Sequence, residues 1–371
     1  MSEELKLIDV TASDFAAKEL VEGREENDRY PFAPLCEGLL AKAQEVGFFA
    51  VMLPEELGGS AEAVQALCLV LQDVCKEDAS LGGVIFTAAL ALELIAQAGG
   101  REILKEVAAA ASPGEAIVAF PSFNNPGEIL PDLRADGKDG GYELAGRADY
   151  VVLGGVASRA LLPARAGDGY SLFLLDLKGE GVSAGDPVLS LGLHACPAVD
   201  LELGGAAGTL VGAEGRGGAY FEAAVDRLSV AAAAMAAGVI KGSFEAAFAY
   251  AKERVQGGRE IVNWSEVRMI LSSMAVAGKV AEMLVEQAGR AVDAAEPGWQ
   301  LASRAAALQV QEIAAEVTCD GIQLLGGNGY MKDYGQEKRF RDAKQIQALL
   351  GLAPMRRLKY IRRVADGEPP W

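Results

Sequence analysis

Apolar residues recur at steps of three and four over two long parts of the chain, and this spacing predicts amphipathic helices. Near the start the pattern covers residues 64–74 and 88–98, with paired glycines between the apolar runs. After Gly215 the same period returns in three stripes. These are Val225, Leu228, Ala232, Met235 and Val239; Val267, Ile270, Leu271, Met274, Ala281, Leu284 and Val285; and Val310, Ile313, Val317 and Leu324. The later segments are long and rich in alanine, which favours close antiparallel packing in a bundle.

Between these two parts the helical period stops, and short apolar runs alternate with Gly, Asp, Asn and Pro. Five runs are expected to form strands. They are 116–120, 142–145, 150–153, 171–177 and 199–203. The pattern predicts a multi-domain α+β protein: an N-terminal helical domain over 1–113, a middle β-barrel or β-sandwich domain over 114–220, and a C-terminal four-helix bundle over 221–371.

Composition narrows the kind of partner this protein can have. Of its 371 residues 51% are hydrophobic, which is enough for a large core and argues against global disorder. The net charge of −18 argues against nucleic acid or an anionic membrane surface as the main partner, because both would be repelled. An anionic small ligand remains compatible, since local Arg and Lys groups act at short range. The single histidine and the lack of a Cys/His cluster argue against a transition-metal site.

The cysteines and the first residues indicate a compartment. Five cysteines, an odd number without CxxC spacing, are expected to be free thiols in a reducing cytoplasm. The acidic start has no apolar core of a secretory signal. The most apolar stretches, 81–92 and 228–240, are too short and too rich in small residues to span a bilayer. A cytoplasmic protein without a membrane span is therefore expected.

Six segments then occur in a recognisable order. They are Glu45-Val-Gly-Phe-Phe-Ala-Val-Met-Leu-Pro-Glu-Glu-Leu-Gly-Gly59, Leu191-Gly-Leu193, Gly212-Ala-Glu-Gly-Arg-Gly217, Tyr250-Ala-Lys-Glu-Arg254, Gln323-Leu-Leu-Gly-Gly-Asn-Gly-Tyr330 and Glu337-Lys-Arg-Phe-Arg-Asp342. Together, from about residue 30 to residue 365, the chain resembles the acyl-CoA dehydrogenases. Each segment is weak alone, but their common register on an α–β–α layout makes the resemblance strong.

The resemblance implies a tetrameric flavoprotein, either a homotetramer or a heterotetramer. In this family FAD lies between the β domain of one subunit and the C-terminal helices of another. A glutamate removes the α-proton of an acyl-CoA thioester, and the β-hydrogen leaves as hydride to the flavin. Electrons then pass to an electron-transferring flavoprotein. No metal is implied.

The base that this chemistry needs is missing from its usual place. The family's Tyr-Glu-Gly-Thr run falls on Leu349-Leu-Gly-Leu352, so Leu350 stands at the glutamate position and cannot accept a proton. A displaced base found in some members falls on Asp226, which is one methylene shorter than glutamate. The alternative is that Asp226 is an ordinary acid in the first turns of a helix. Arg227, the next residue, is expected to orient or contact the acyl-CoA.

The resemblance divides the flavin-binding residues into two sets. Arg254, Gln323, Gly326 and Gly327 match the residues that hold the FAD pyrophosphate and adenosine of a neighbouring subunit. Glycines allow close approach of the backbone to phosphate, and a guanidinium suits its charge. The alternative for the glycines is a simple helix C-cap and turn. The phenylalanine expected three residues after Arg254 is Gly257.

The set that would cradle the flavin ring departs from the family in several places. The Thr-Glu-Pro-x-x-Gly-Ser-Asp segment falls on Phe120-Pro-Ser-Phe-Asn-Asn-Pro-Gly127 and loses its hydroxyls there. A Trp-Ile-Thr run becomes Tyr150-Val-Val152, in which Tyr150 can still stack on a ring and Val152 has no hydroxyl. The sole histidine, His194, is expected to be a surface or loop residue.

Three functions stay open at this point. The chain is an FAD-dependent acyl-CoA dehydrogenase with Asp226 as displaced base, acting on an unusual, bulky or cyclic acyl-CoA. Or it is a non-catalytic subunit that completes the FAD site and the tetramer of a heteromeric acyl-CoA dehydrogenase. Or it is a flavin-free homologue that binds an acyl-CoA for another purpose.

Overall fold

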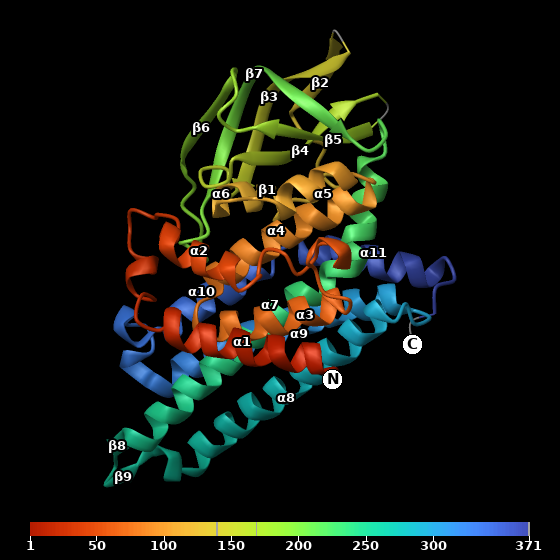
Figure 1. Cartoon of the computed structure of the whole chain (residues 1–371). Helices are drawn as coiled ribbons and strands as arrows, with labels where there is room; N and C mark the ends of the chain where they lie inside the picture. Colours follow the sequence, from red (N-terminus) through yellow and green to blue (C-terminus); the bar gives the residue numbers. More distant parts are fainter. Residues whose placement is uncertain (139, 168, 370–371) are drawn as a thin grey trace.

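The computed structural model describes residues 1–138, 140–167 and 169–369, and in it a β-rich domain stands at one end of a mostly helical body (Figure 1). The first part of the chain forms α1 (Glu3–Glu19), α2 (Glu37–Glu45), α3 (Ala63–Glu77), α4 (Ala79–Gln97), α5 (Arg101–Ala108) and α6 (Pro113–Ala116). The last part forms α7 (Gly217–Glu253), α8 (Ser265–Asp293), α9 (Trp299–Leu325), α10 (Gln336–Ile346) and α11 (Ala353–Ala365). The predicted fold, with two helical regions around a β-rich middle, is confirmed.

Helix α7 is the centre of the helical body. It packs against α9 and α8 of its own region and against α3 and α4 of the N-terminal region, so the two helical regions share one core. Small residues allow this close packing. A Cβ on Gly238 would lie 2.4 Å from the carbonyl oxygen of Gln72 on α3. The alanine-rich sequence of α7 therefore both favours the helix and lets four neighbours approach it.

The β-rich domain is a closed barrel. Its strands are β1 (Val118–Ala119), β2 (Arg134–Lys138), β3 (Gly141–Val152), β4 (Arg159–Ala166), β5 (Gly169–Asp176), β6 (Val182–Pro187) and β7 (Ala198–Val211). Neighbours run β1-β4-β2-β3-β7-β5, β6 pairs with β7, and β5 also pairs with β4, which closes the ring. A separate short hairpin, β8 (Val255–Gln256) and β9 (Arg259–Glu260), joins α7 to α8.

The strand predictions were only partly right. The runs 142–145 and 150–153 belong to one bulged strand, β3, and the run 116–120 contains only the two-residue β1. Strands β2, β4 and β6 were not predicted. Strands β2 and β6 are mostly exposed and polar, and β4 is buried on both faces and contains Pro163, so none of them alternates clearly between apolar and polar residues.

The two most apolar helices, α4 and α7, lie inside the fold. By length and composition both could cross a membrane, so the prediction that the apolar stretches are too short was wrong for the helices that contain them. Their most apolar windows are 94% and 83% buried within the protein. The apolar residues are thus accounted for by the protein core.

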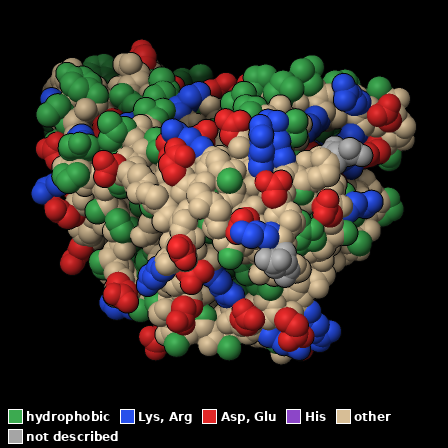
Figure 2. All heavy atoms as spheres, turned by 90° about the horizontal axis from the view of Figure 1, so that it is seen from above, with side chains coloured by type: hydrophobic (Ala, Val, Ile, Leu, Met, Phe, Trp, Pro, Cys, Tyr) green, Lys and Arg blue, Asp and Glu red, His purple; other side chains and the backbone are tan. Residues whose placement is uncertain are grey.

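Charge is mixed on the barrel end of the molecule. Figure 2, which looks down on that end, shows acidic and basic side chains interspersed rather than a region of one sign. Arg147 on β3, for example, pairs with Asp149 at 2.5 Å and with Asp200 at 2.6 Å. On this face the two signs of charge thus alternate.

Candidate functional site

Leu350 lies in the turn between α10 and α11, in the left-handed region at φ 64°, and its side chain is fully buried. Its backbone N–H donates to the carbonyl oxygen of Ser122 at 2.9 Å. The next residue, Gly351, is in equally close contact with the same loop, since a Cβ there would lie 2.9 Å from Cβ of Asn125. The loop after β1 therefore packs directly on this turn, and the residue at its centre has no group that can accept a proton.

Tyr150 lies near the end of β3, and its side chain makes contacts with other residues of this chain. Its hydroxyl accepts a hydrogen bond from Nε2 of Gln345 on α10 at 2.9 Å, and its ring meets the ring of Phe123 edge-on at 5.5 Å. Burial raises the pKa of this hydroxyl. Val152 exchanges two backbone hydrogen bonds with Phe120, at 3.2 and 3.3 Å. The residues expected to cradle a flavin ring thus contact one another across the junction of the barrel and α10.

Asp226 lies on α7 in a network of ion pairs. Its Oδ1 accepts hydrogen bonds from Nε of Arg304 on α9 and from Nη1 of Arg363 on α11, both at 2.5 Å. The Arg304 side chain is only 5% exposed and the Asp226 side chain 14%, so water screens these pairs little. One turn earlier on α7, Glu222 also accepts from Arg304, at 2.9 Å.

The same network reaches the loop that covers Leu350. Lys359 on α11 pairs with Glu222 at 2.7 Å and with Glu128 at 3.6 Å, and Glu128 is a member of the loop after β1. Although burial raises the pKa of Glu222, its contacts with Lys359 and Arg304 hold that pKa below its ordinary value. Ionised carboxylates and cations thus join α7, α9, α11 and this loop.

The other members of this network were not found from the sequence. Arg304, Lys359, Arg363 and Glu222 come from three different helices. One signal was available: Arg304 interrupts an apolar stripe of α9, three residues after the buried Leu301. A charge on a buried stripe needs a partner, and that partner is the candidate base.

Arg227 points to a different neighbour from Asp226. Its Nε lies 3.1 Å from Oε1 of Glu93 on α4, and the Glu93 side chain is 6% exposed. Adjacent residues on a helix face different sides, so the pair Asp226-Arg227 cannot serve one small group together. The structure places Arg227 against the N-terminal helices.

The remaining candidate residues gather at another end of the molecule. Arg254 ends α7, and Gln323, Gly326 and Gly327 end α9; all four are exposed. Asn328, in the same glycine turn, donates to the Tyr250 hydroxyl at 3.1 Å, one helical turn before Arg254. The following hairpin β8–β9 lies at the opposite end of the body from the barrel (Figure 1). The Tyr250–Asn328 bond therefore brings the end of α7 and the glycine turn after α9 together.

This exposed set fits a phosphate-bearing ligand. Gly326 has φ 57° and ψ −130°, which only glycine adopts readily, and a Cβ there would have open space around it. Its backbone can therefore be approached closely, beside a guanidinium. Gly326 is also the C-cap of α9, so the simpler role of a helix end is present as well. The exposed set thus offers groups that suit a phosphate, whereas Tyr150 of the set expected to cradle a flavin ring contacts Gln345 and Phe123.

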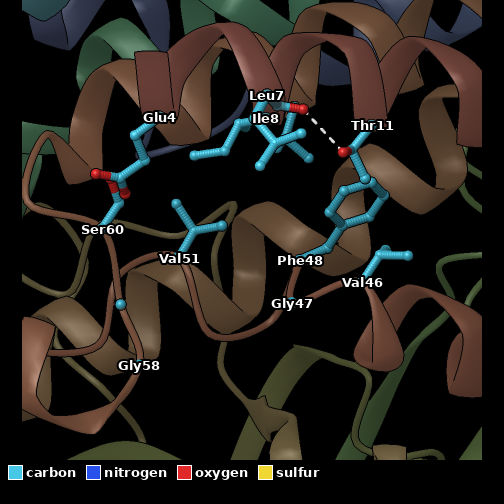
Figure 3. Close-up of a pocket in the computed structure, with 12 residues that line it drawn as sticks. Glu4, Leu7, Ile8, Thr11, Val46, Gly47, Phe48, Val51, Gly58 and Ser60 are labelled. Atoms are coloured by element: carbon cyan, nitrogen blue, oxygen red, sulfur yellow. Dashed lines mark hydrogen bonds between the residues drawn. The ribbon is translucent and has the colours of Figure 1, made fainter. Parts of the chain in front are cut away.

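The five described cavities lie elsewhere: none has Ser122, Tyr150, Val152 or Leu350 among its lining residues. One of them, a cleft of about 240 Å³, is shown in Figure 3. Leu7 and Ile8 of α1 point there toward Val51 and Phe48 of the segment after α2. It is an apolar cleft of the N-terminal region and contains none of the candidate residues.

His194 is not the surface residue that was expected. It does lie in a loop, but it is buried, with Nδ1 at 2.7 Å from Oδ1 of Asp28 and its ring stacked on Phe32 at 3.7 Å. Arg341 on α10 also pairs with Asp28, at 2.5 Å. The histidine therefore belongs to a structural contact among the N-terminal region, the barrel and α10.

The chain matches two family models and is similar to known proteins. The family model "Acyl-CoA dehydrogenase, N-terminal domain" matches residues 2–115, and "Acyl-CoA dehydrogenase, C-terminal domain" matches residues 215–365. The chain is 28% identical to the probable acyl-CoA dehydrogenase FadE25 of Mycobacterium tuberculosis, over 90% of this chain and 87% of that protein. It is 27% identical to cyclohex-1-ene-1-carbonyl-CoA dehydrogenase of Syntrophus aciditrophicus, over 96% and 89% of the two chains.

Two further matches extend the comparison. The caffeyl-CoA reductase-Etf complex subunit CarC of Acetobacterium woodii is 26% identical, over 96% of this chain and 97% of that protein. Among solved structures, butyryl-CoA dehydrogenase from Megasphaera elsdenii superimposes with a TM-score of 0.90 at 21% identity, over 98% and 99% of the two chains. The likeness in fold extends over nearly the whole length of both.

Proposed function

This chain belongs to the acyl-CoA dehydrogenase family, and from that premise we propose that it serves FAD-dependent α,β-dehydrogenation of an acyl-CoA as the non-catalytic subunit of a heteromeric enzyme. Its relatives are named as dehydrogenases, and the family is one of enzymes. The observation that carries the proposal is Leu350, a buried leucine where the proton acceptor of the family stands.

Asp226, the candidate displaced base, does not replace the glutamate that is missing at position 350. A general base must offer a carboxylate oxygen to the substrate's α-proton. Oδ1 of Asp226 already accepts charge-assisted hydrogen bonds from Arg304 and Arg363. Such bonds are among the strongest in proteins, and here two of them tie the carboxylate to α9 and α11. Asp226 is therefore assigned a structural role.

The exposed set, Arg254, Gln323, Gly326 and Gly327, is proposed to hold the pyrophosphate and adenosine of an FAD whose ring lies in the partner subunit. When bound there, FAD supplies the hydride acceptor. This chain's own share is binding: a guanidinium for phosphate charge and an open glycine backbone for close approach. Tyr150, tied to Gln345, is proposed to brace the barrel against α10 in place of stacking on a flavin.

The proposal also assigns partners. The partner subunit is a homologue that carries the glutamate, and the assembly is a heterotetramer in the cytoplasm, where the five free cysteines stay reduced. The acceptor of electrons is an electron-transferring flavoprotein, supported by the relative named as a subunit of an Etf complex. Relatives named for cyclohexene and cyclohexane carbonyl-CoA support a bulky or cyclic acyl group.

The names of these relatives also support a second candidate function. In it the chain is a self-sufficient dehydrogenase of a cyclic acyl-CoA, with Asp226 as its base. For this enzyme, substrate binding would have to release Asp226 from at least one arginine. The flavin ring would also have to separate Tyr150 from its contacts. A flavin-free protein that binds acyl-CoA is the remaining alternative.

A flavin absorbance spectrum separates the three. The chain expressed alone should be colourless, and co-expression with a glutamate-bearing homologue should give one FAD for each pair of chains. Arg254→Ala in this chain should remove flavin from the pair. The matched control, Arg259→Ala, lies in the same hairpin region but stacks on Trp264, and flavin should stay bound.

Other outcomes decide against the proposal. A yellow protein with one FAD per chain when expressed alone favours the self-sufficient enzyme, and loss of turnover in Asp226→Asn with flavin retained would then identify the base. A colourless pair that still binds acyl-CoA favours the flavin-free protein.

A further inference from the structure

A cavity of about 380 Å³ lies between four helices, and none of the candidate site residues discussed above lines it. Helices α1, α3, α7 and α8 pack side by side around it. Its lining on α3 runs from Gln65 to Asp73, a rise of eight steps, which at about 1.5 Å per step makes an elongated space of roughly 12 Å. Buried apolar side chains, Leu5 and Val285 among them, form much of its wall.

Two hydrogen-bond acceptors of this cavity have no donor. Oε1 of Gln72 and Oδ2 of Asp73 are both shielded from solvent and unpartnered. The Gln72 side chain is 7% exposed, and its amide nitrogen donates to the carbonyl oxygen of Cys68 at 3.4 Å. That bond fixes the orientation of the amide, because only the nitrogen can donate there. Both orphaned atoms therefore require a donor, and a buried acceptor without one is unfavourable.

Charge at this end of the cavity is also unbalanced. Asp9 of α1 and Glu282 of α8 join Asp73, while Lys241 is the cation of the lining at this end. Lys241 lies 3.4 Å from Glu282 and so is already shared. Burial and the neighbouring Asp9 raise the pKa of Asp73 to about 6, and the nearby cations Lys241 and Lys76 offset this rise only in part.

The other end of the cavity differs. There Arg290 of α8 lies near Gln65, whose backbone and side-chain amides donate to Asp293. Glu286, one turn earlier on α8, accompanies Arg290, so the lining carries the acids Asp9, Asp73, Glu282 and Glu286 against the basic side chains of Lys241 and Arg290. A ligand with one positive end and an aliphatic body matches this excess of acid and the apolar part of the wall.

We propose that this cavity binds a small organic cation, a primary ammonium group on an unbranched aliphatic chain, with Gln72 and Asp73 as its acceptors. An ammonium offers three donors and one positive charge, and so supplies both orphaned oxygens and offsets the repulsion between Asp9 and Asp73. Water could donate to the oxygens but would leave the charge unbalanced. Among the described residues no three His, Cys, Asp or Glu side chains converge as a metal site, so a metal ion is not the occupant.

Isothermal titration calorimetry with 1-aminopentane on the intact chain tests the proposal. Saturable one-to-one binding is expected. Asp73→Asn, which keeps the shape of the side chain, should weaken binding about tenfold or more, as expected for loss of a charged hydrogen bond. Asp9→Asn, on another helix, should weaken it as well.

One control variant and several possible outcomes test the proposal further. Asp14→Asn changes an exposed acid of α1 that pairs with Lys18 outside the cavity, and it should leave binding unchanged. The proposal is refuted if 1-aminopentane shows no saturable binding. It is also refuted if the variants Asp73→Asn and Asp9→Asn bind 1-aminopentane as tightly as the unmodified chain does. Equal binding of 1-pentanol would show that charge is not recognised, and competition by MgCl₂ would show a metal site; either result also rejects it.

Discussion

Replacing Asp226 with asparagine tests whether this acid is structural. The change leaves the shape of the side chain and removes the charge that Arg304 and Arg363 share. Removing one partner from a buried ion pair costs about 3–5 kcal/mol, because the other charge stays buried without compensation. Here both arginines keep a second acid, Glu222 and Glu368, so the expected loss of unfolding free energy is smaller, about 2 kcal/mol.

The assay is urea unfolding followed by circular dichroism and tryptophan fluorescence, with thermal unfolding beside it. A loss of this size corresponds to a fall in Tm of roughly 3 °C for 371 residues that unfold together. The control is Asp149→Asn, which removes an equally short pair with Arg147 on the exposed barrel surface. Exposed pairs contribute about 0–1 kcal/mol, so the control should change stability little.

The double variant with Arg363→Met makes the test quantitative. If Asp226 and Arg363 interact as described, the two losses should not add, with a coupling of about 0.5–3 kcal/mol. A loss for Asp226→Asn no greater than that for Asp149→Asn, with no coupling to Arg363, would refute the structural role. The carboxylate would then be available for proton transfer, and the self-sufficient enzyme would become the better proposal.

Three further predictions concern stability. Gly329→Ala should cost about 2–3 kcal/mol in urea unfolding, because its Cβ would lie 2.1 Å from the carbonyl oxygen of Ile322, whereas Gly137→Ala meets no atom within 4 Å and should be nearly neutral. The pKa of Asp73 is raised from 3.8 to about 6, so the charge of Asp73 destabilises the folded protein above about pH 6. Asp73→Asn should raise the free energy of unfolding by about 1–2 kcal/mol near pH 8. This gain should vanish on acidification to about pH 4. The pKa of Asp28 is shifted in the opposite direction, since it is lowered in the folded protein. The ionised Asp28 therefore stabilises the protein above the pKa of the unfolded chain, and this stabilisation is lost in acid. Asp28→Asn should lower the free energy of unfolding at about pH 7, and progressively less below about pH 4.

The α–β–α order of the chain was predictable because helical period and strand-like runs are local properties of the sequence. The stripe through Leu228 and Met235 predicted the buried face of α7. Polar edge strands such as β6 gave no such signal, because their pairing with β7 depends on backbone hydrogen bonds and not on an apolar pattern. The identity of Leu350, and with it the absence of a carboxylate at that position, also needed no structure.

What only the tertiary structure decided is how the remaining acids and bases are used. Asp226 is ionically paired with residues 78 and 137 positions away, and no spacing rule relates them. His194 is buried against Asp28, 166 positions earlier in the chain, for the same reason. Local sequence determines the elements and the chemistry that each position can offer. The partner that a charge meets is set by packing between helices far apart in the chain, and here that packing turns a candidate base into an anchor for two arginines.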